Sequence, residues 1–232
     1  MKNSTKKSKY IKFLKIILFI IIVVASLNVI YRKYEEKTLK KEIEAVITKD
    51  FSKDQLNTSI KTNLNYAKVE KEIKNYLTDY STSTKKILTL INDDKLKTIL
   101  SSSNYSSDGP NFLSTTSYLT ELKQNINNEI TSLEELTQTK TIMSYIKRDN
   151  LNKYYEKLYK QLLTKQYYKD TIQTNYNKIK NSTDNIILLI DQEQQVINFL
   201  TNCKTWIIKD GKLIFNKEDD LITYNSLIKE IK

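Results

Sequence analysis

Four serines are followed by a lysine three residues later, a spacing that some acyl-transfer enzymes use to let the lysine amine take the proton of the serine hydroxyl. They are Ser4, Ser83, Ser144 and Ser226. In a chain with 38 basic residues and many serines, about three such pairs arise by chance. Neither a Lys-Thr-Gly nor a Ser-Asp-Asn motif accompanies them. We interpret the pairs as coincidental, and they identify no nucleophile.

The composition excludes most other site chemistry. The chain has no histidine and one cysteine, Cys203, which rules out His- and Cys-based metal centres, His-dependent triads and internal disulfides. Its two glycines are far apart, so a glycine-rich phosphate loop is impossible. Acidic neighbours such as Asp93-Asp94 would point about 100° apart on a helix and rarely converge on one metal or proton. We therefore predict a non-enzymatic protein with no cofactor and no metal.

Aromatic residues are the remaining candidates for a binding surface. The segment 154–176 holds six tyrosines interleaved with lysines, and such a mixture can stack on bases or line a glycan or membrane-interface surface. Core packing is the favoured interpretation, because Tyr155 and Tyr176 already fall on apolar helix faces and the composition is rich in tyrosine throughout. The candidate partner surface consists of Tyr154, Tyr159, Tyr167, Tyr168 and Trp206.

The N-terminal region predicts a membrane segment. Residues 1–15 form a basic tail without acids, and residues 16–31 are free of charge and strongly apolar. A helix from Tyr10 to Arg32 would be about 34 Å long, enough to span a hydrocarbon core of roughly 30 Å. We expect residues 16–31 to be a single transmembrane signal-anchor that contacts the lipid bilayer.

A cleaved signal peptide is the alternative, because Val24-Ala25-Ser26 is an acceptable cleavage site. The apolar run continues past it to Tyr31, which favours retention. Six lysines in the tail favour a cytoplasmic N-terminus, with the bulk of the chain outside the cytoplasm. No later run is long enough to form a second span.

The remaining chain predicts an all-α body. Residues 32–205 contain one glycine and one proline, adjacent at Gly109-Pro110, and apolar residues recur three and four positions apart. We expect an elongated antiparallel bundle. Its predicted helices cover about 32–49, 54–92, 93–100, 112–148, 151–162 and 172–200, with 101–111 as the one clear loop.

Two further patterns refine this architecture. Positions 172 to 200 keep a heptad spacing with Thr183 and Glu193 as polar interruptions, which indicates a bundle core or, alternatively, an intermolecular coiled coil. Segment 206–216 predicts a β-hairpin around Asp210-Gly211, with Trp206 opposite Phe215 and Ile208 opposite Leu213. The hairpin would serve as a lid on the bundle or offer an edge to a partner. A terminal helix is expected within 217–232.

These features favour an interaction, adaptor or structural module anchored at a bacterial cell envelope. In composition and topology the chain resembles small envelope proteins of low-GC bacteria, without a motif that carries a family name. We expect a protein partner or self-association through helix faces, and no nucleic acid, because only two arginines are present and the basic residues form no arginine-rich patch. A secreted helical factor and an accessory ligand-sensing domain are the alternatives.

Overall fold

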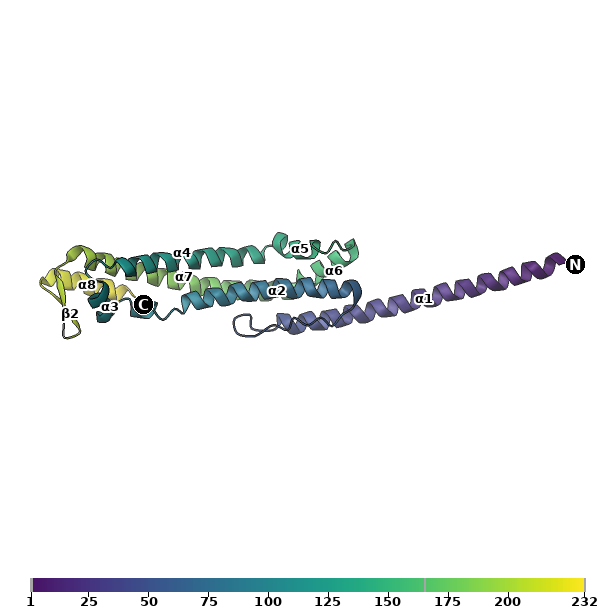
Figure 1. The fold of residues 1–232 in the computed structure, drawn as a ribbon, viewed down its shortest axis with the longest axis horizontal. Coiled ribbons are helices and arrows are strands. Elements are labelled where there is room, and N and C mark those ends of the chain that lie inside the picture. Colours follow the sequence, from purple (N-terminus) through teal and green to yellow (C-terminus); the bar gives the residue numbers. More distant parts are fainter. Residues whose placement is uncertain (1, 165, 232) are drawn as a thin grey trace.

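The long N-terminal helix and the helical body beside it dominate the computed structural model, which describes residues 2–164 and 166–231 (Figure 1). The side chains of residues 2–12, 166 and 167 lie outside the described part. Within that part the chain forms eight α-helices, one 3₁₀ turn and one two-stranded antiparallel sheet. The all-α expectation with a small hairpin and a terminal helix is therefore confirmed at this level.

Helix α1 (Lys2–Ile47) is continuous and has two different halves. From Phe13 to Ile30 its large apolar side chains are exposed, and Phe13–Ile47 is long and apolar enough to cross a membrane. Beyond Tyr31 the helix packs on the body and buries Leu39, Ile43, Val46 and Ile47. No glycine or proline interrupts it, so the exposed half continues into the packed half without a break.

Three long helices run side by side along the body: α2 (Leu64–Ile91), α4 (Leu113–Thr137) and α7 (Gln166–Cys203) (Figure 1). The shorter α5 (Thr139–Lys147) and α6 (Lys153–Leu163) cover one end of α2. The heptad positions of α7 face inward, since Ile172, Ile190 and Leu200 are buried together with the polar Thr183 and Glu193. The pattern serves packing within this chain.

Four segments differ from the expected ones. Residues 55–63 are extended rather than helical, because backbone N–H groups there bond to buried carboxylates. Residues 101–111, expected as a loop, contain α3 (Ser102–Asp108), whose first turn is capped by Ser101. The predicted helix 112–148 is split at Gln138, whose extended backbone separates α4 from α5. The expected helix 93–100 is reduced to the 3₁₀ turn Leu96–Thr98.

The C-terminal hairpin has the predicted register. Strands β1 (Trp206–Lys209) and β2 (Lys212–Phe215) place Trp206 opposite Phe215 and Ile208 opposite Leu213. Asp210 and Gly211 both have positive φ, as a two-residue turn of this type requires. Helix α8 (Glu218–Glu230) then packs against α7 and β2.

The buried side chains form two clusters along the long axis. The larger, here called the body core, joins α1, α2, α5, α6 and the first half of α7. The smaller, here called the head core, joins α3, the start of α4 and the end of α7, and the hairpin and α8 cover it. Figure 1 places the head core at the end of the molecule that points away from the exposed half of α1.

Candidate functional site

The tyrosines of the candidate partner surface are not gathered on one exposed face. Tyr159 is fully buried, and its hydroxyl donates to the Ile142 carbonyl at 2.8 Å. Tyr168 is also buried and donates to Glu44 at 3.0 Å. The side chain of Tyr167 lies outside the described residues. Tyr159 and Tyr168 are thus parts of the body core, as the core-packing interpretation expected.

Tyr154 is half-buried and joins three helices at the point where α1 meets the body. Its hydroxyl donates to Glu36 of α1 and shares a hydrogen bond of 3.0 Å with Tyr66 of α2. The Arg32 guanidinium lies 4.3 Å from the centre of its ring, a favourable cation–π distance. These contacts attach α6 to the first turn of α1 beyond the exposed apolar half.

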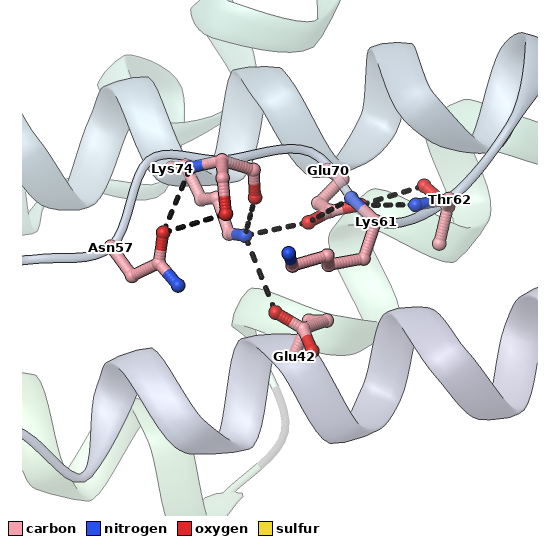
Figure 2. A network of polar contacts seen from close by, with 7 residues as sticks. Glu42, Asn57, Lys61, Thr62, Glu70 and Lys74 are labelled. Carbon is pink, nitrogen blue, oxygen red and sulfur yellow. Dashed lines mark hydrogen bonds and ion pairs between the residues drawn. The ribbon is translucent and has the colours of Figure 1, made fainter.

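A buried ion pair holds the extended segment 55–63 against α1 and α2 (Figure 2). Lys74 Nζ lies 2.6 Å from Glu70 Oε1 and 3.6 Å from Glu42, and it donates to the Ser59 carbonyl at 2.6 Å. The Glu70 carboxylate also accepts from the N–H groups of Lys61 and Thr62. A buried pair is tolerated only when its remaining polar groups are satisfied, and these are.

The charge of Glu70 is maintained by its donors. Burial alone would raise the pKa of this carboxyl, but the Lys74 amine and the N–H groups of Lys61 and Thr62 outweigh burial and lower the pKa. A second buried carboxylate, Glu35, accepts from the backbone and side-chain nitrogens of Asn63. Both carboxylates are fully engaged in fixing the segment, so the network is structural.

Trp206, the fifth residue of the candidate surface, is half-buried in the head. Its ring stacks on Phe112 at 5.8 Å and lies 6.2 Å from the Tyr105 ring, while Nε1 donates to the Leu200 carbonyl at 2.8 Å. Gly109 permits this approach, because a Cβ there would lie 2.5 Å from the indole. Trp206 therefore attaches the hairpin to α3, α4 and α7.

The outer face of the hairpin presents two exposed apolar side chains. Ile207 and Ile214 are partners across the two strands and are 50% and 40% exposed. The first turns of α8 add Leu221 and Ile222, which are 41% and 60% exposed. We call these four residues the head surface. The alternation along the hairpin places Ile207 and Ile214 opposite the packed face, a signal that our sequence reasoning did not use.

One carboxylate of the head has an unpaired oxygen. Glu193 lies in the head core at 5% exposure, and its Oε2 has no hydrogen-bond partner within the described residues. Burial raises the pKa of this carboxyl to about 7. The phenols of Tyr105 and Tyr118 are the titratable groups near enough to sense its charge.

A small hollow of about 110 Å³ lies where α4 meets α5 and α6 meets α7. Ile142, Leu163 and Ile172 line it with threonines at its mouth, and its volume is below the roughly 150 Å³ that holds benzene. Among the described residues no three acidic or cysteine side chains converge to hold a metal. No family model, curated protein or solved structure matches the chain.

Proposed function

We propose that the chain is a non-enzymatic adaptor of the bacterial cell envelope, anchored by the exposed half of α1 and binding a protein partner through its head. The observation that carries the proposal is the change of character along α1. The eighteen residues from Phe13 to Ile30 are all exposed, and the same helix then becomes part of the body core. Such a stretch is about 27 Å long, which matches a hydrocarbon core of roughly 30 Å.

The body serves as a spacer in this proposal. Helix α7 has 38 residues and is therefore about 57 Å long. Its first half lies beside α1 and its last turn reaches the hairpin. The head surface is thus separated from the bilayer by roughly the length of the body. A partner would bind at that distance from the membrane.

Binding would use the head surface itself. Ile207 and Ile214 offer a small apolar face on a hairpin, flanked by the exposed Lys209 and Lys212. Apolar centres with a polar rim are the usual anatomy of a protein–protein contact. The proposal assigns no catalytic residue and no nucleic-acid contact.

Labelling of the unique thiol tests the topology. Cys203 is partly exposed beside the hairpin, so a membrane-impermeant maleimide applied to intact cells should modify it if the head lies outside. Modification only after lysis would overturn the external location. A Cys203→Ser variant controls for reagent specificity, and a cysteine introduced at exposed Asp210 gives a second readout.

Photocrosslinking tests partner binding. A photoreactive phenylalanine analogue at Ile207 should give a discrete adduct with another protein in intact cells. The matched control is the same analogue at Leu188, which is 57% exposed on α7, outside the head surface. Equal adducts at both positions, or none at Ile207, would contradict an adaptor that binds through the head.

A secreted factor is the second candidate, favoured by one specific observation. Cleavage after Ser26 would remove no residue of the body core, since the described side chains from Phe13 to Ser26 are exposed and the first residue packed on that core is Tyr31. The body would therefore keep its core in either form. The mass of the mature chain separates the two: an intact N-terminus in the membrane fraction supports the anchor, and a chain starting at Leu27 in the medium supports secretion.

A further inference from the structure

The end of the body from which α1 emerges is rich in exposed basic side chains. Lys33 and Lys37 lie on α1, just beyond the apolar half, and both are exposed. Lys147, Arg148 and Lys153 lie at the turn between α5 and α6 and are exposed as well. We call these five residues the basic collar.

Contacts of Tyr154 place the two groups at one level. This residue is in the first turn of α6, one position after Lys153, and it touches Arg32 and Glu36 of α1. The α5–α6 turn therefore lies beside the first helical turn that follows the exposed apolar half. Figure 1 shows the same end of the body, with α5 and α6, where α1 leaves it.

The acids of this region are turned toward the body. The sequence alternates basic and acidic residues from Arg32 to Glu44, which suggests neutralisation by ion pairs along the helix. Instead Glu35 accepts from Asn63 and is buried, Glu36 accepts from Tyr154, and Glu44 accepts from Tyr168. The carboxylates are used as acceptors for neutral donors of the body.

The collar amines are consequently left without acidic partners. None of the ion pairs among the described residues involves a collar side chain; Arg148 instead lies 4.5 Å above the Tyr145 ring. Asp149 and Glu156 are the remaining acids nearby and are only partly exposed. A hollow on α1 is lined by the four lysines Lys33, Lys37, Lys40 and Lys41 together with Glu36 and Glu44.

Resting on the proposed anchor, we propose that the basic collar binds the phosphate groups of anionic lipids in the leaflet where α1 leaves the bilayer. Lys33 lies about 4.5 Å and Lys37 about 10.5 Å beyond Ile30, the end of the apolar half, along the helix. The headgroup layer is about 5–7 Å thick on each side, and lysine side chains can extend toward it. Both amines therefore reach lipid phosphates.

This contact fixes the height and tilt of the body. A single membrane helix would leave the tilt of the body relative to the membrane unrestricted. Positive charges at two separate points, Lys33 and the α5–α6 turn, would both contact the membrane surface and restrict that tilt. The attraction falls off within a Debye length of about 8 Å. Lys41, about 12 Å beyond Lys33 along the helix, should contribute much less.

Amine footprinting of the full chain tests the proposal. The protein is placed in nanodiscs of phosphatidylcholine, or of the same lipid with about a quarter phosphatidylglycerol, and acetylated with a water-soluble ester. We expect acetylation of Lys33, Lys37, Lys147 and Lys153 to slow about fivefold in the anionic discs. Protection at Lys41 should be weaker, Lys209 and Lys212 of the hairpin should be unchanged, and high salt should abolish the effect.

Two matched variants provide a second readout. The collar variant carries K33Q, K37Q, K147Q and K153Q, and the head variant carries K204Q, K209Q, K212Q and K217Q, so each loses four charges from exposed positions. Phosphatidylglycerol retained by the detergent-purified protein is measured by native mass spectrometry. Retention should be lost in the collar variant and kept in the head variant.

The outcomes distinguish failure of the collar proposal from failure of the membrane-anchor proposal. If the chain fails to enter nanodiscs of either composition, the anchor itself is overturned and the collar proposal falls with it. If it enters both, but collar lysines react equally in neutral and anionic discs, the collar proposal alone is overturned. Equal lipid loss in both variants would also overturn it, because it would show a general effect of net charge.

Discussion

The body core and the head core use the same residue types in different ways. In the body core each large buried tyrosine finds an acceptor: Tyr76 donates to the Leu136 carbonyl, Tyr80 to Ile172 and Tyr159 to Ile142. Burial raises the pKa of all three phenols, so they stay neutral donors. The buried Glu70–Lys74 pair is satisfied in the same way.

The elements that cover the head core are less buried. Helix α8 contributes no fully buried residue, and the hairpin packs only one of its faces. An unpaired buried carboxylate oxygen is common to both regions, on Glu72 in the body and on Glu193 in the head. Two-stranded sheets are marginal alone, so the head depends on a few contacts such as Trp206 on Phe112. The difference indicates a stable body that carries a more easily opened head, since elements with fewer buried contacts open at lower free energy.

The largest expected effect lies in the body. Replacing Lys74 with Met leaves Glu70 buried without its cation, and breaking a buried pair in this way costs about 3–5 kcal/mol. Lys180→Met is the matched control, because the Lys180–Asp184 pair is solvent-exposed and should change stability by less than about 1 kcal/mol. Urea unfolding followed by circular dichroism measures both. Equal small losses would show that the Glu70–Lys74 network does not hold the body.

A smaller and more local effect is expected at Gly109. An alanine Cβ there would lie 2.5 Å from the Trp206 indole and from the Tyr105 carbonyl oxygen, so the ring must move. Overpacking of this kind costs about 1–3 kcal/mol. Tryptophan fluorescence should report loosening of the only indole, while unfolding of the body is unchanged.

The matched control for Gly109→Ala is Ser106→Ala, on the exposed side of α3. Gly211→Ala is unsuitable as a control, because φ is positive at that residue and an alanine there would strain the backbone.

Glu193 should make the stability of the head depend on pH. Its pKa is raised from 4.5 to about 7 on folding, so between these values the unfolded chain has released the proton that the folded chain retains. Stability is therefore highest below pH 4.5 and falls as pH rises toward 7, by about 3 kcal/mol.

Glu193→Gln should remove this slope and stabilise the head near neutral pH. The measurement is head unfolding, followed by Trp206 fluorescence in denaturant across the pH range. The matched control is Glu121→Gln, which changes an exposed carboxylate on α4. A slope that survives in Glu193→Gln would assign the pH dependence to other groups.

The smallest effect on stability is expected at the head surface. Ile207→Ser replaces a half-exposed side chain outside the core and should change stability by less than about 0.5 kcal/mol. Ile208→Ser, the next residue, faces the packed side of the hairpin and should cost more. Crosslinking through a photoreactive analogue at Ile214, the cross-strand partner, should weaken in Ile207→Ser although the fold is intact. Crosslinking that is unaffected would remove Ile207 from the binding surface.

Most of the fold could be predicted from two features of the sequence: the helical spacing of apolar residues and the Asp-Gly turn of the hairpin. The positions from Ile172 to Leu200 repeat at heptad spacing and are mostly buried, and Asp210-Gly211 fixed the register of the hairpin correctly. The extended segment 55–63 could not be read from periodicity, because it depends on Glu35 and Glu70, whose roles as buried acceptors exist only after folding. Asn57, which accepts from the Ser59 N–H, was the one local signal of a turn.

The candidate site was less predictable than the fold. Tyrosines and lysines are abundant throughout the chain, so their proximity in sequence did not separate the core residue Tyr159 from the junction residue Tyr154. The basic collar joins residues more than a hundred positions apart, and the sequence pairs its lysines with acids that the fold directs elsewhere. The burial of the tyrosines and the assembly of the basic collar both depend on tertiary contacts, which the sequence pattern does not show.

Hydrogen exchange of the full chain in nanodiscs tests the central comparison most directly. We predict that amides of α3, the hairpin and α8 exchange through openings at least about 2 kcal/mol less costly than those that expose α2 and the first half of α7. The exchange should therefore divide the molecule at the boundary between the two cores. Uniform protection along the chain, or a head protected more strongly than the body, would contradict the account of a stable body carrying a labile head.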